Sequence, residues 1–161
     1  MTPPLRRRLA SMLYEAMLLF GVLFVAAWLF STLLQQRNAL YLREGLEVWL
    51  FFVLGLYFIW CWTHGGQTLP MKTWRIRLVT TEGLAVSPRR ALVRYVFSWF
   101  WFLPGLALAK LVHAQAWMLV VFPAINMVLW AMTILFDKDR QFLHDRLAGT
   151  RLIVCVAPPA A

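Results

Sequence analysis

One carboxylate stands inside the first long apolar segment of the chain. Between residues 9 and 34 Glu15 is the only charged residue, and Arg6, Arg7 and Arg8 come just before this segment. A carboxylate at the centre of a bilayer costs about 2.5 kcal/mol or more, so it needs polar partners within the protein. Glu15 is therefore either a structural acid paired with an Arg or Lys of another helix, or a site that binds a proton or a cation.

Arg8 and Glu15 belong to one helical face. They are seven residues apart, which is about two turns and about 10 Å along the axis of a helix. A long arginine side chain lets its charge leave an apolar region. We therefore expect Arg8 to reach the headgroups at the membrane surface, with Glu15 between that surface and the bilayer midplane.

Acidic and basic residues alternate directly after the last apolar segment. Asp137 follows that segment, at a helix C-terminus, where a carboxylate is unfavourable unless a cation lies beside it. Lys138 and Asp139 are typical of a solvated helix surface whose charges neutralise each other. His144 and Asp145 are neighbours, and we expect a local hydrogen-bonded pair there, in preference to a metal site or an acid/base pair.

The same tail, residues 137–150, has an apolar edge. In a helix, Phe142, Leu143 and Leu147 lie toward one side, and this pattern favours a helix that lies on the membrane surface. We therefore expect a polar tail with one side in contact with lipid.

The composition excludes most classes of soluble protein. Of the 161 residues, 61% are hydrophobic, and the mean hydropathy is +0.66. A soluble domain of this size has no interior large enough to bury so much apolar surface, so the sequence predicts an integral membrane protein. The net charge of +9 would suggest a nucleic-acid partner for a soluble protein. Here we expect the anionic headgroups of the cytoplasmic leaflet instead, and no nucleic acid.

The apolar segments predict how the chain crosses the bilayer within a single domain over residues 1–161. Pro104 and Gly105 should kink or break the third segment. Only a few residues link the third and fourth segments, so these should be antiparallel neighbours, and Asn126 should hydrogen-bond across helices. The four segments lie at about residues 9–34, 46–64, 91–111 and 115–136.

Two short segments have the residue pattern of strands. Residues 75–80 alternate apolar and polar, residues 81–83 predict a turn, and residues 84–86 predict a short return strand. A further strand is predicted at residues 151–156. We expect residues 75–80 and 151–156 to pair in one small cytoplasmic sheet. The predicted fold class is therefore an all-α membrane protein with four transmembrane helices and a small cytoplasmic β element.

Lysine and arginine concentrate in alternate connections. The N-terminal arm has three, the second connection with the start of the third segment has six, and the tail has four, whereas the other side has three. Connections rich in Lys and Arg stay in the cytoplasm. The count predicts four spans with both termini cytoplasmic. We expect the protein to lie in the inner (plasma) membrane of a bacterium. A re-entrant third segment is the second alternative.

The remaining reactive residue types show no catalytic spacing. Cys61 and Cys155 form no CxxC pair, which argues against a membrane thiol oxidoreductase. His64, His113 and His144 lie far apart and lack the spacing of metal ligands. No HExxH, GxSxG, P-loop or GxGxxG motif is present. We therefore expect no enzyme, no catalytic residue, no metal and no cofactor.

Three further motifs accompany the first segment. Residues 66–72 read Gly-Gln-Thr-Leu-Pro-Met-Lys and precede the basic strand, and residues 89–95 read Arg-Arg-Ala-Leu-Val-Arg-Tyr. After Asp137, residues 140–150 read Arg-Gln-Phe-Leu-His-Asp-Arg-Leu-Ala-Gly-Thr. This last run is the most specific of the three, because it fixes many residue types at once.

Together these segments resemble the RDD family of small membrane proteins, which is named for an arginine and an aspartate of its first span and a second, later aspartate. Arg8 matches the arginine, and Glu15 stands where the family has Asp. Pro70 replaces the usual glycine of a Gly-Gln-Thr-Leu-Gly-Lys turn. Arg94 matches the arginine of the central stretch, and Asp145 matches the second named aspartate.

The resemblance covers nearly the whole chain. A transport role has been suggested for the family, and some members are described as sodium/proton antiporters. The first hypothesis is therefore cation/proton exchange, which in so short a chain implies a homo-oligomer. The alternative is a structural or assembly module that binds a partner membrane protein or anionic lipid. In the exchange hypothesis Glu15 binds the proton or cation, and Arg8 and Asp145 set its potential. In the alternative, polar residues at the cytoplasmic side form a network that fixes the helix ends to the sheet. The candidate functional or structural polar cluster is Arg8, Glu15, Gln67, Thr68, Arg94, Asp137 and Asp145.

Overall fold

The computed structural model describes residues 2–34, 42–135, 137 and 141–155. These residues form two compact units. The N-terminal unit is Pro3–Arg77 with Val154 and Cys155, and the C-terminal unit is Leu78–Ile153 with Thr2. The expectations for Lys138 and Asp139, and for the first part of the connection after residue 34, lie outside the described residues. The single domain over residues 1–161 stays a prediction.

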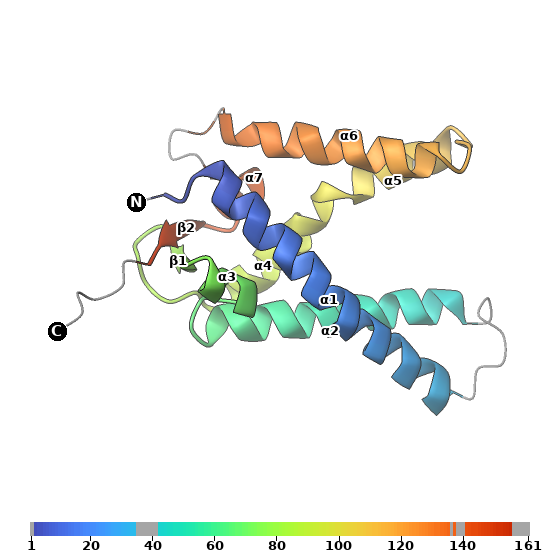
Figure 1. Ribbon diagram of the computed structural model, residues 1–161, viewed down its shortest axis with the longest axis horizontal. Helices are drawn as coiled ribbons and strands as arrows, with labels where there is room; N and C mark the ends of the chain where they lie inside the picture. The colour runs from blue at the N-terminus through green and yellow to red at the C-terminus, as the bar shows by residue number, and fades with distance from the viewer. Residues whose placement is uncertain (1, 35–41, 136, 138–140, 156–161) are drawn as a thin grey trace. The chain divides into compact units, whose positions relative to one another are not determined.

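The N-terminal unit is built on a helical hairpin of α1 and α2 (Figure 1). Two hydrogen bonds fix its antiparallel register: the Trp49 indole N–H donates to the Ala26 carbonyl at 3.1 Å, and the Tyr57 hydroxyl donates to Glu15. The helices are antiparallel because the later residue of α2, Tyr57, contacts the earlier residue of α1, Glu15. The elements of this unit are α1 (Leu5–Leu33), α2 (Arg43–Thr63), α3 (Leu69–Thr73) and the first residues of β1 (Ile76–Thr80).

Helix α1 buries polar residues and exposes apolar ones. Arg8, Ser11 and Glu15 are buried on one stripe at a spacing of three and four residues, whereas Phe20 and Phe24 are 74% and 67% exposed. This is the reverse of a helix on a soluble core, and it suits a helix whose outer faces meet lipid. The expectation that Arg8 reaches the headgroups is wrong: its side chain is turned into the protein and is 1% exposed.

The turn after α2 is made by glycine and closed by a cap. Gly65 and Gly66 both have positive φ, which ends α2 at Thr63. Thr68 then caps α3, because its side chain accepts the Met71 N–H. Pro70 lies in the first turn of α3, where its missing N–H has no helical partner to lose.

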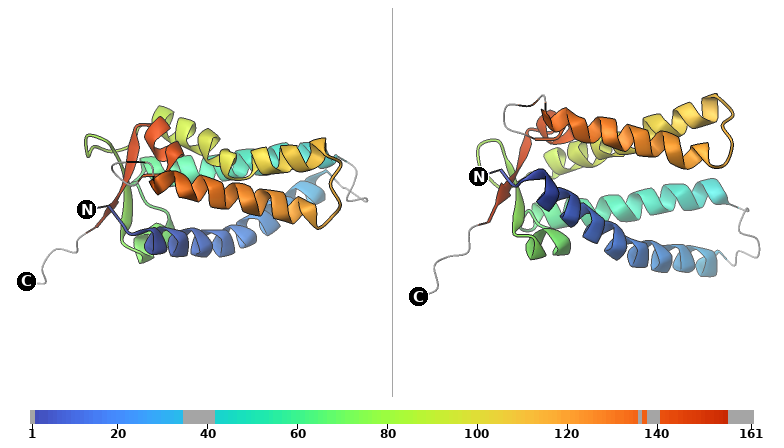
Figure 2. Two further views of the ribbon diagram at one scale, coloured as in Figure 1. Left: turned by 90° about the horizontal axis from the view of Figure 1, so that it is seen from above. Right: turned by 45° about the horizontal axis from the view of Figure 1, so that its top comes forward.

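The C-terminal unit contains a broken helix packed on a long one. In Figure 2, α5 (yellow) and α6 (orange) lie side by side and antiparallel, as the short link between them predicts. Gly105 allows the close approach, since a Cβ there would lie 2.8 Å from the Phe122 carbonyl oxygen and from the Pro123 Cα. The elements are α4 (Pro88–Ser98), η1 (Trp99–Trp101), α5 (Leu103–Leu111), α6 (Met118–Met132), η2 (Thr133–Leu135), α7 (Leu143–Leu147) and most of β2 (Thr150–Val154).

The break in the third apolar segment has an identifiable cause. The axes of Pro88–Trp101 and Leu103–Leu111 differ by 42°. Proline has no N–H, so Pro104 cannot donate the helical hydrogen bond to the Phe100 carbonyl, four residues before it. The Asn126 side chain takes that role and donates to the Phe100 and Trp101 carbonyls at 2.8 and 2.7 Å. The hydrogen bond predicted for Asn126 is thus confirmed, and it stabilises the break.

The predicted pairing of two strands is confirmed. β1 and β2 form an antiparallel pair, with the Cys155 N–H donating to the Arg75 carbonyl at one end and the Thr81 N–H donating to the Gly149 carbonyl at the other. The return strand predicted at residues 84–86 is wrong. The chain makes a turn with Gly83 at a φ of 87°, and residues 84–86 then lead to α4 without strand structure.

The tail differs in part from the surface helix predicted for it: Leu143 and Leu147 are exposed, whereas Phe142 is buried. Among the described tail residues, helix α7 covers Leu143–Leu147 alone. Phe142 is 1% exposed, and its ring packs edge-on against Trp101 with the ring centroids 5.4 Å apart. An apolar side chain near a membrane can leave water by packing against protein or by contacting lipid. Phe142 packs against protein.

Three helical stretches among the described residues are long and apolar enough to cross a membrane: α1, α2 and Met118–Leu135. The bent pair Pro88–Trp101 and Leu103–Leu111 supplies a fourth if it is counted as one span. The fold is therefore mostly helical with a small two-stranded sheet, as the sequence predicts. The count of four spans and the cytoplasmic position of the sheet stay predictions.

Candidate functional site

The seven candidate residues fall into two groups, one in each unit. The N-terminal cluster contains Arg8, Glu15, Gln67 and Thr68, and the C-terminal cluster contains Arg94, Asp137 and Asp145.

Glu15 joins three elements of the N-terminal unit. The Tyr57 hydroxyl, on α2, donates to its Oε1 at 2.8 Å. The Thr68 hydroxyl, at the start of α3, donates to its Oε2. Both carboxylate oxygens thus accept a hydrogen bond from a neutral hydroxyl, and Glu15 itself is 9% exposed. Hydrogen bonds of this kind offset the cost of placing a carboxylate in an apolar region.

The polar turn before α3 holds both helix and strand. Thr68 is 1% exposed, and its hydroxyl both caps α3 and donates to Glu15. The preceding Gln67 donates from Nε2 to the Ile76 carbonyl at 2.7 Å, and the same nitrogen lies 3.7 Å from the Cys155 sulfur. Adjacent residues of one turn therefore fasten α1 and the sheet.

The arginines at the start of α1 contact backbone carbonyls. Nε of Arg8 donates to the Pro3 carbonyl at 3.1 Å. Nε of Arg7 donates to the Trp74 carbonyl, which follows α3. The first turn of α1 is thereby held to the end of α3, in addition to the bond between Thr68 and Glu15.

A buried ion pair is the centre of the C-terminal cluster. Nε of Arg94, on α4, lies 2.8 Å from Oδ1 of Asp145, on α7, and the two side chains are 10% and 0% exposed. Thr150 adds a further link, since its hydroxyl donates to the Asp145 carbonyl at 3.1 Å. The pair connects the helix that begins the third apolar segment to the tail.

His144 extends this ion pair to α6. The Trp130 indole N–H donates to Nδ1 of His144 at 3.2 Å, and an indole nitrogen is a donor only. Nδ1 must therefore be unprotonated, so the imidazole proton is on Nε2, which lies 3.5 Å from Oδ1 of Asp145. The ring also stacks on Phe142 with an interplanar angle of 13°. His144 is 4% exposed, so this neutral tautomer is enclosed by protein.

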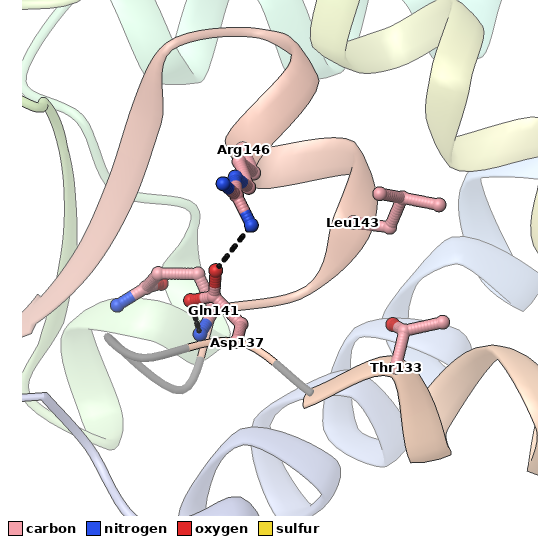
Figure 3. A pocket seen from close by; sticks show the side chains of 5 residues that line it. All are labelled: Thr133, Asp137, Gln141, Leu143 and Arg146. Atoms are coloured by element: carbon pink, nitrogen blue, oxygen red, sulfur yellow. Dashed lines mark hydrogen bonds and ion pairs between the residues drawn. The ribbon is translucent and has the colours of Figure 1, made fainter. Parts of the chain in front are cut away.

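Asp137, which follows the last apolar segment, has a cation beside it. Nη1 of Arg146 lies 3.2 Å from its Oδ1, and the Gln141 N–H donates to its Oδ2 at 2.9 Å; Figure 3 shows both contacts. The Gln141 side chain continues to the sheet, because its Oε1 accepts the Leu152 N–H at 3.1 Å. Gln141 thus holds the tail motif through two groups: its backbone N–H binds Asp137, and its side chain binds β2.

A pocket opens beside these residues. It encloses about 200 Å³ and is lined by Thr133, Asp137, Gln141, Leu143 and Arg146 (Figure 3). Its carboxylate and its guanidinium already face each other. The two charged groups of the pocket are therefore paired with each other.

The match to a family model covers most of the chain. A model of the RDD family matches residues 2–149, which include all seven candidate residues. The chain belongs to the RDD family. No curated protein and no solved structure matches it.

Sequence reasoning missed three partners of the RDD motif residues: Tyr57, Trp130 and Gln141. Tyr57 is the only tyrosine of the second apolar segment, and a hydroxyl in an apolar helix was a signal that could have indicated a partner for Glu15. Gln141 lies within the RDD tail motif itself. Trp130 carried no such signal, because tryptophan is also common where it merely faces lipid headgroups.

Metal binding has no support from side-chain grouping. Within residues 2–34, 42–135, 137 and 141–155, no three His, Cys, Asp or Glu side chains gather closely enough to hold a metal ion. What the two RDD clusters do chemically is accept and donate hydrogen bonds between elements of the chain.

Proposed function

We propose that this RDD protein is a structural or assembly module of the membrane, which holds its helices in a fixed arrangement for a partner membrane protein and has no enzymatic activity. One observation carries the proposal. The carboxylates of Glu15 and Asp145, at the positions of the two acids for which the family is named, both bind side chains of other elements of the same unit.

In these contacts the polar groups bind other elements of the same unit. Both Glu15 oxygens accept hydroxyl hydrogen bonds, and Asp145 is fully buried against Arg94. A buried ion pair contributes little net stability compared with apolar packing, but breaking it is costly, so it favours one arrangement of its elements. Such fixed elements are what a docking partner requires.

We also propose the bacterial inner membrane as the location, with four spans and both termini in the cytoplasm. The distribution of Lys and Arg supports this orientation. The bent pair Pro88–Trp101 and Leu103–Leu111 would be the third span. Counting it as one span places the tail on the same side as the basic N-terminal arm.

Cation/proton exchange is the second candidate, and one observation favours it. Glu15 lies within a candidate span beside two hydroxyl oxygens, those of Tyr57 and Thr68. Carboxylate and hydroxyl oxygens are ligands that hard cations accept. Exchange would require these hydroxyls to turn their oxygens to a cation, and a homo-oligomer would have to complete the pathway.

An ion-flux measurement separates the two candidates. The purified protein is reconstituted in vesicles, and Na⁺/H⁺ and K⁺/H⁺ exchange are followed with a pH-sensitive dye. We expect flux equal to that of protein-free vesicles for the wild type, for Glu15→Gln and for the control Glu44→Gln. Glu44 lies at the opposite end of the hairpin and is exposed. Flux that Glu15→Gln abolishes and Glu44→Gln retains would overturn the proposal in favour of exchange.

A further inference from the structure

One end of the N-terminal unit carries an exposed group of cations around a tryptophan. We define the basic patch as Arg6, Arg7, Lys72, Trp74 and Arg75. Arg6 and Arg7 lie in the first turn of α1, Lys72 lies on α3, and Trp74 and Arg75 follow α3. Of these, Arg7 is half-buried and the other four side chains are exposed.

Backbone contacts bring the members of the basic patch together. Arg7 donates from Nε to the Trp74 carbonyl, which joins the start of α1 to the end of α3. The Arg75 N–H donates to the Lys72 carbonyl at 3.0 Å, so these two cations lie on one tight turn. The patch is therefore held in place by the fold, although Arg6, Lys72 and Arg75 are exposed.

Arg75 occupies a backbone conformation that its side chain disfavours. Its φ is 51°, in the left-handed region that glycine adopts without steric cost. The Arg75 carbonyl accepts the Cys155 N–H at 2.8 Å, so the conformation is fixed by the end of the sheet. Glycine would suit the backbone better, and strained residues of this kind concentrate at functional sites. This strain makes the Arg75 guanidinium a candidate for a role other than folding.

The charges of the unit are separated along the hairpin. In the described part of the N-terminal unit the acidic residues are Glu15, which is buried, and Glu44 and Glu47, which lie in the first turns of α2. From Glu47 to the end of α2 at Thr63 the helix rises about 24 Å. The basic patch lies beyond that end, so these exposed acids are too far away to neutralise it.

We propose that the basic patch binds the phosphate groups of anionic phospholipids at the membrane surface. The patch lies where α1 begins and α2 ends, which is where a membrane hairpin meets the headgroups. Guanidinium groups bind phosphate oxygens through two parallel hydrogen bonds, and a tryptophan ring prefers the headgroup level. The inference goes beyond the proposed assembly role and does not depend on it.

Native mass spectrometry of the full-length protein tests this inference. The protein in neutral detergent is titrated with phosphatidylglycerol, or with phosphatidylcholine as the uncharged comparison. We expect tighter binding of phosphatidylglycerol, and a loss of about fivefold in its affinity for Arg75→Gly and for Lys72→Gln. Arg43→Gln, which removes one exposed cation from the other end of the hairpin, should bind like the wild type.

The design separates lipid binding from folding. Arg75→Gly relaxes the backbone, so its melting temperature should equal or exceed that of the wild type while its lipid affinity falls. Equal affinity for both lipids, or an equal loss in Arg43→Gln, would overturn the inference. Inorganic phosphate that competes as well as phosphatidylglycerol would do the same, because the patch would then take a free anion.

Discussion

The Arg94 guanidinium and the Asp145 carboxylate form an ion pair with their nearest atoms 2.8 Å apart and with side-chain exposures of 10% and 0%. The two residues are 51 positions apart in the sequence. The pair therefore fixes a helix of the third apolar segment to a tail that follows the fourth. Asp145 is the position of the second aspartate for which the RDD family is named. In this chain it joins α7 to α4 within the C-terminal unit.

Asp145→Asn should destabilise the protein strongly. The substitution leaves the Arg94 charge buried beside a neutral amide, and removing one partner of a buried pair costs about 3–5 kcal/mol. The expected result is a large fall in membrane abundance and in the melting temperature in detergent. Fluorescence-detected size-exclusion chromatography measures both.

Arg146→Gln is the matched control for that change. It breaks the pair between Arg146 and Asp137, in which the arginine side chain is 71% exposed, and pairs of that kind contribute about 1 kcal/mol or less. Equal losses in Asp145→Asn and Arg146→Gln would show that burial of the Arg94 pair has no special weight.

Gly105→Ala should separate α5 from α6. The added methyl group would lie 2.8 Å from the Phe122 carbonyl oxygen and the Pro123 Cα, and backbone atoms of a packed helix move only at a cost of about 1–3 kcal/mol. Gly21→Ala is the control, because a Cβ there meets nothing within 4 Å. Thermal unfolding in detergent should show a lower melting temperature for Gly105→Ala and an unchanged or higher one for Gly21→Ala. A neutral Gly105→Ala would contradict the close helix contact.

Asn126→Leu should loosen the break in the third segment. Leucine keeps the branched shape and the number of side-chain heavy atoms but removes the donor that binds the Phe100 and Trp101 carbonyls. A carbonyl that faces an apolar surrounding without a donor costs about 1–3 kcal/mol. Hydrogen exchange of the amides near Phe102 should accelerate relative to the wild type. Unchanged exchange there would mean that the break is stable without Asn126.

The sequence predicts the elements of this RDD protein better than their contacts. Long apolar runs locate α1 and α2, and the alternation at residues 75–80 locates β1, because each pattern is local. A local pattern does not pair Glu15 with Tyr57, because Tyr57 lies 42 positions away; the hydroxyl in an apolar helix signals only that it needs a partner. Phe142 shows the second limit: lipid and protein interior are both apolar, so hydrophobicity alone does not say which of them a side chain contacts.

The central claim is that the carboxylate of the first span connects elements of the chain, and a double-mutant cycle between Glu15 and Tyr57 tests it most directly. Unfolding free energies are measured in mixed micelles for the wild type, Glu15→Leu, Tyr57→Phe and the double variant. Contacting residues show interaction energies of about 0.5–3 kcal/mol, whereas independent ones add. We predict an interaction energy of at least about 0.5 kcal/mol, with the double variant more stable than the sum of the single losses implies. Additive losses would contradict the claim.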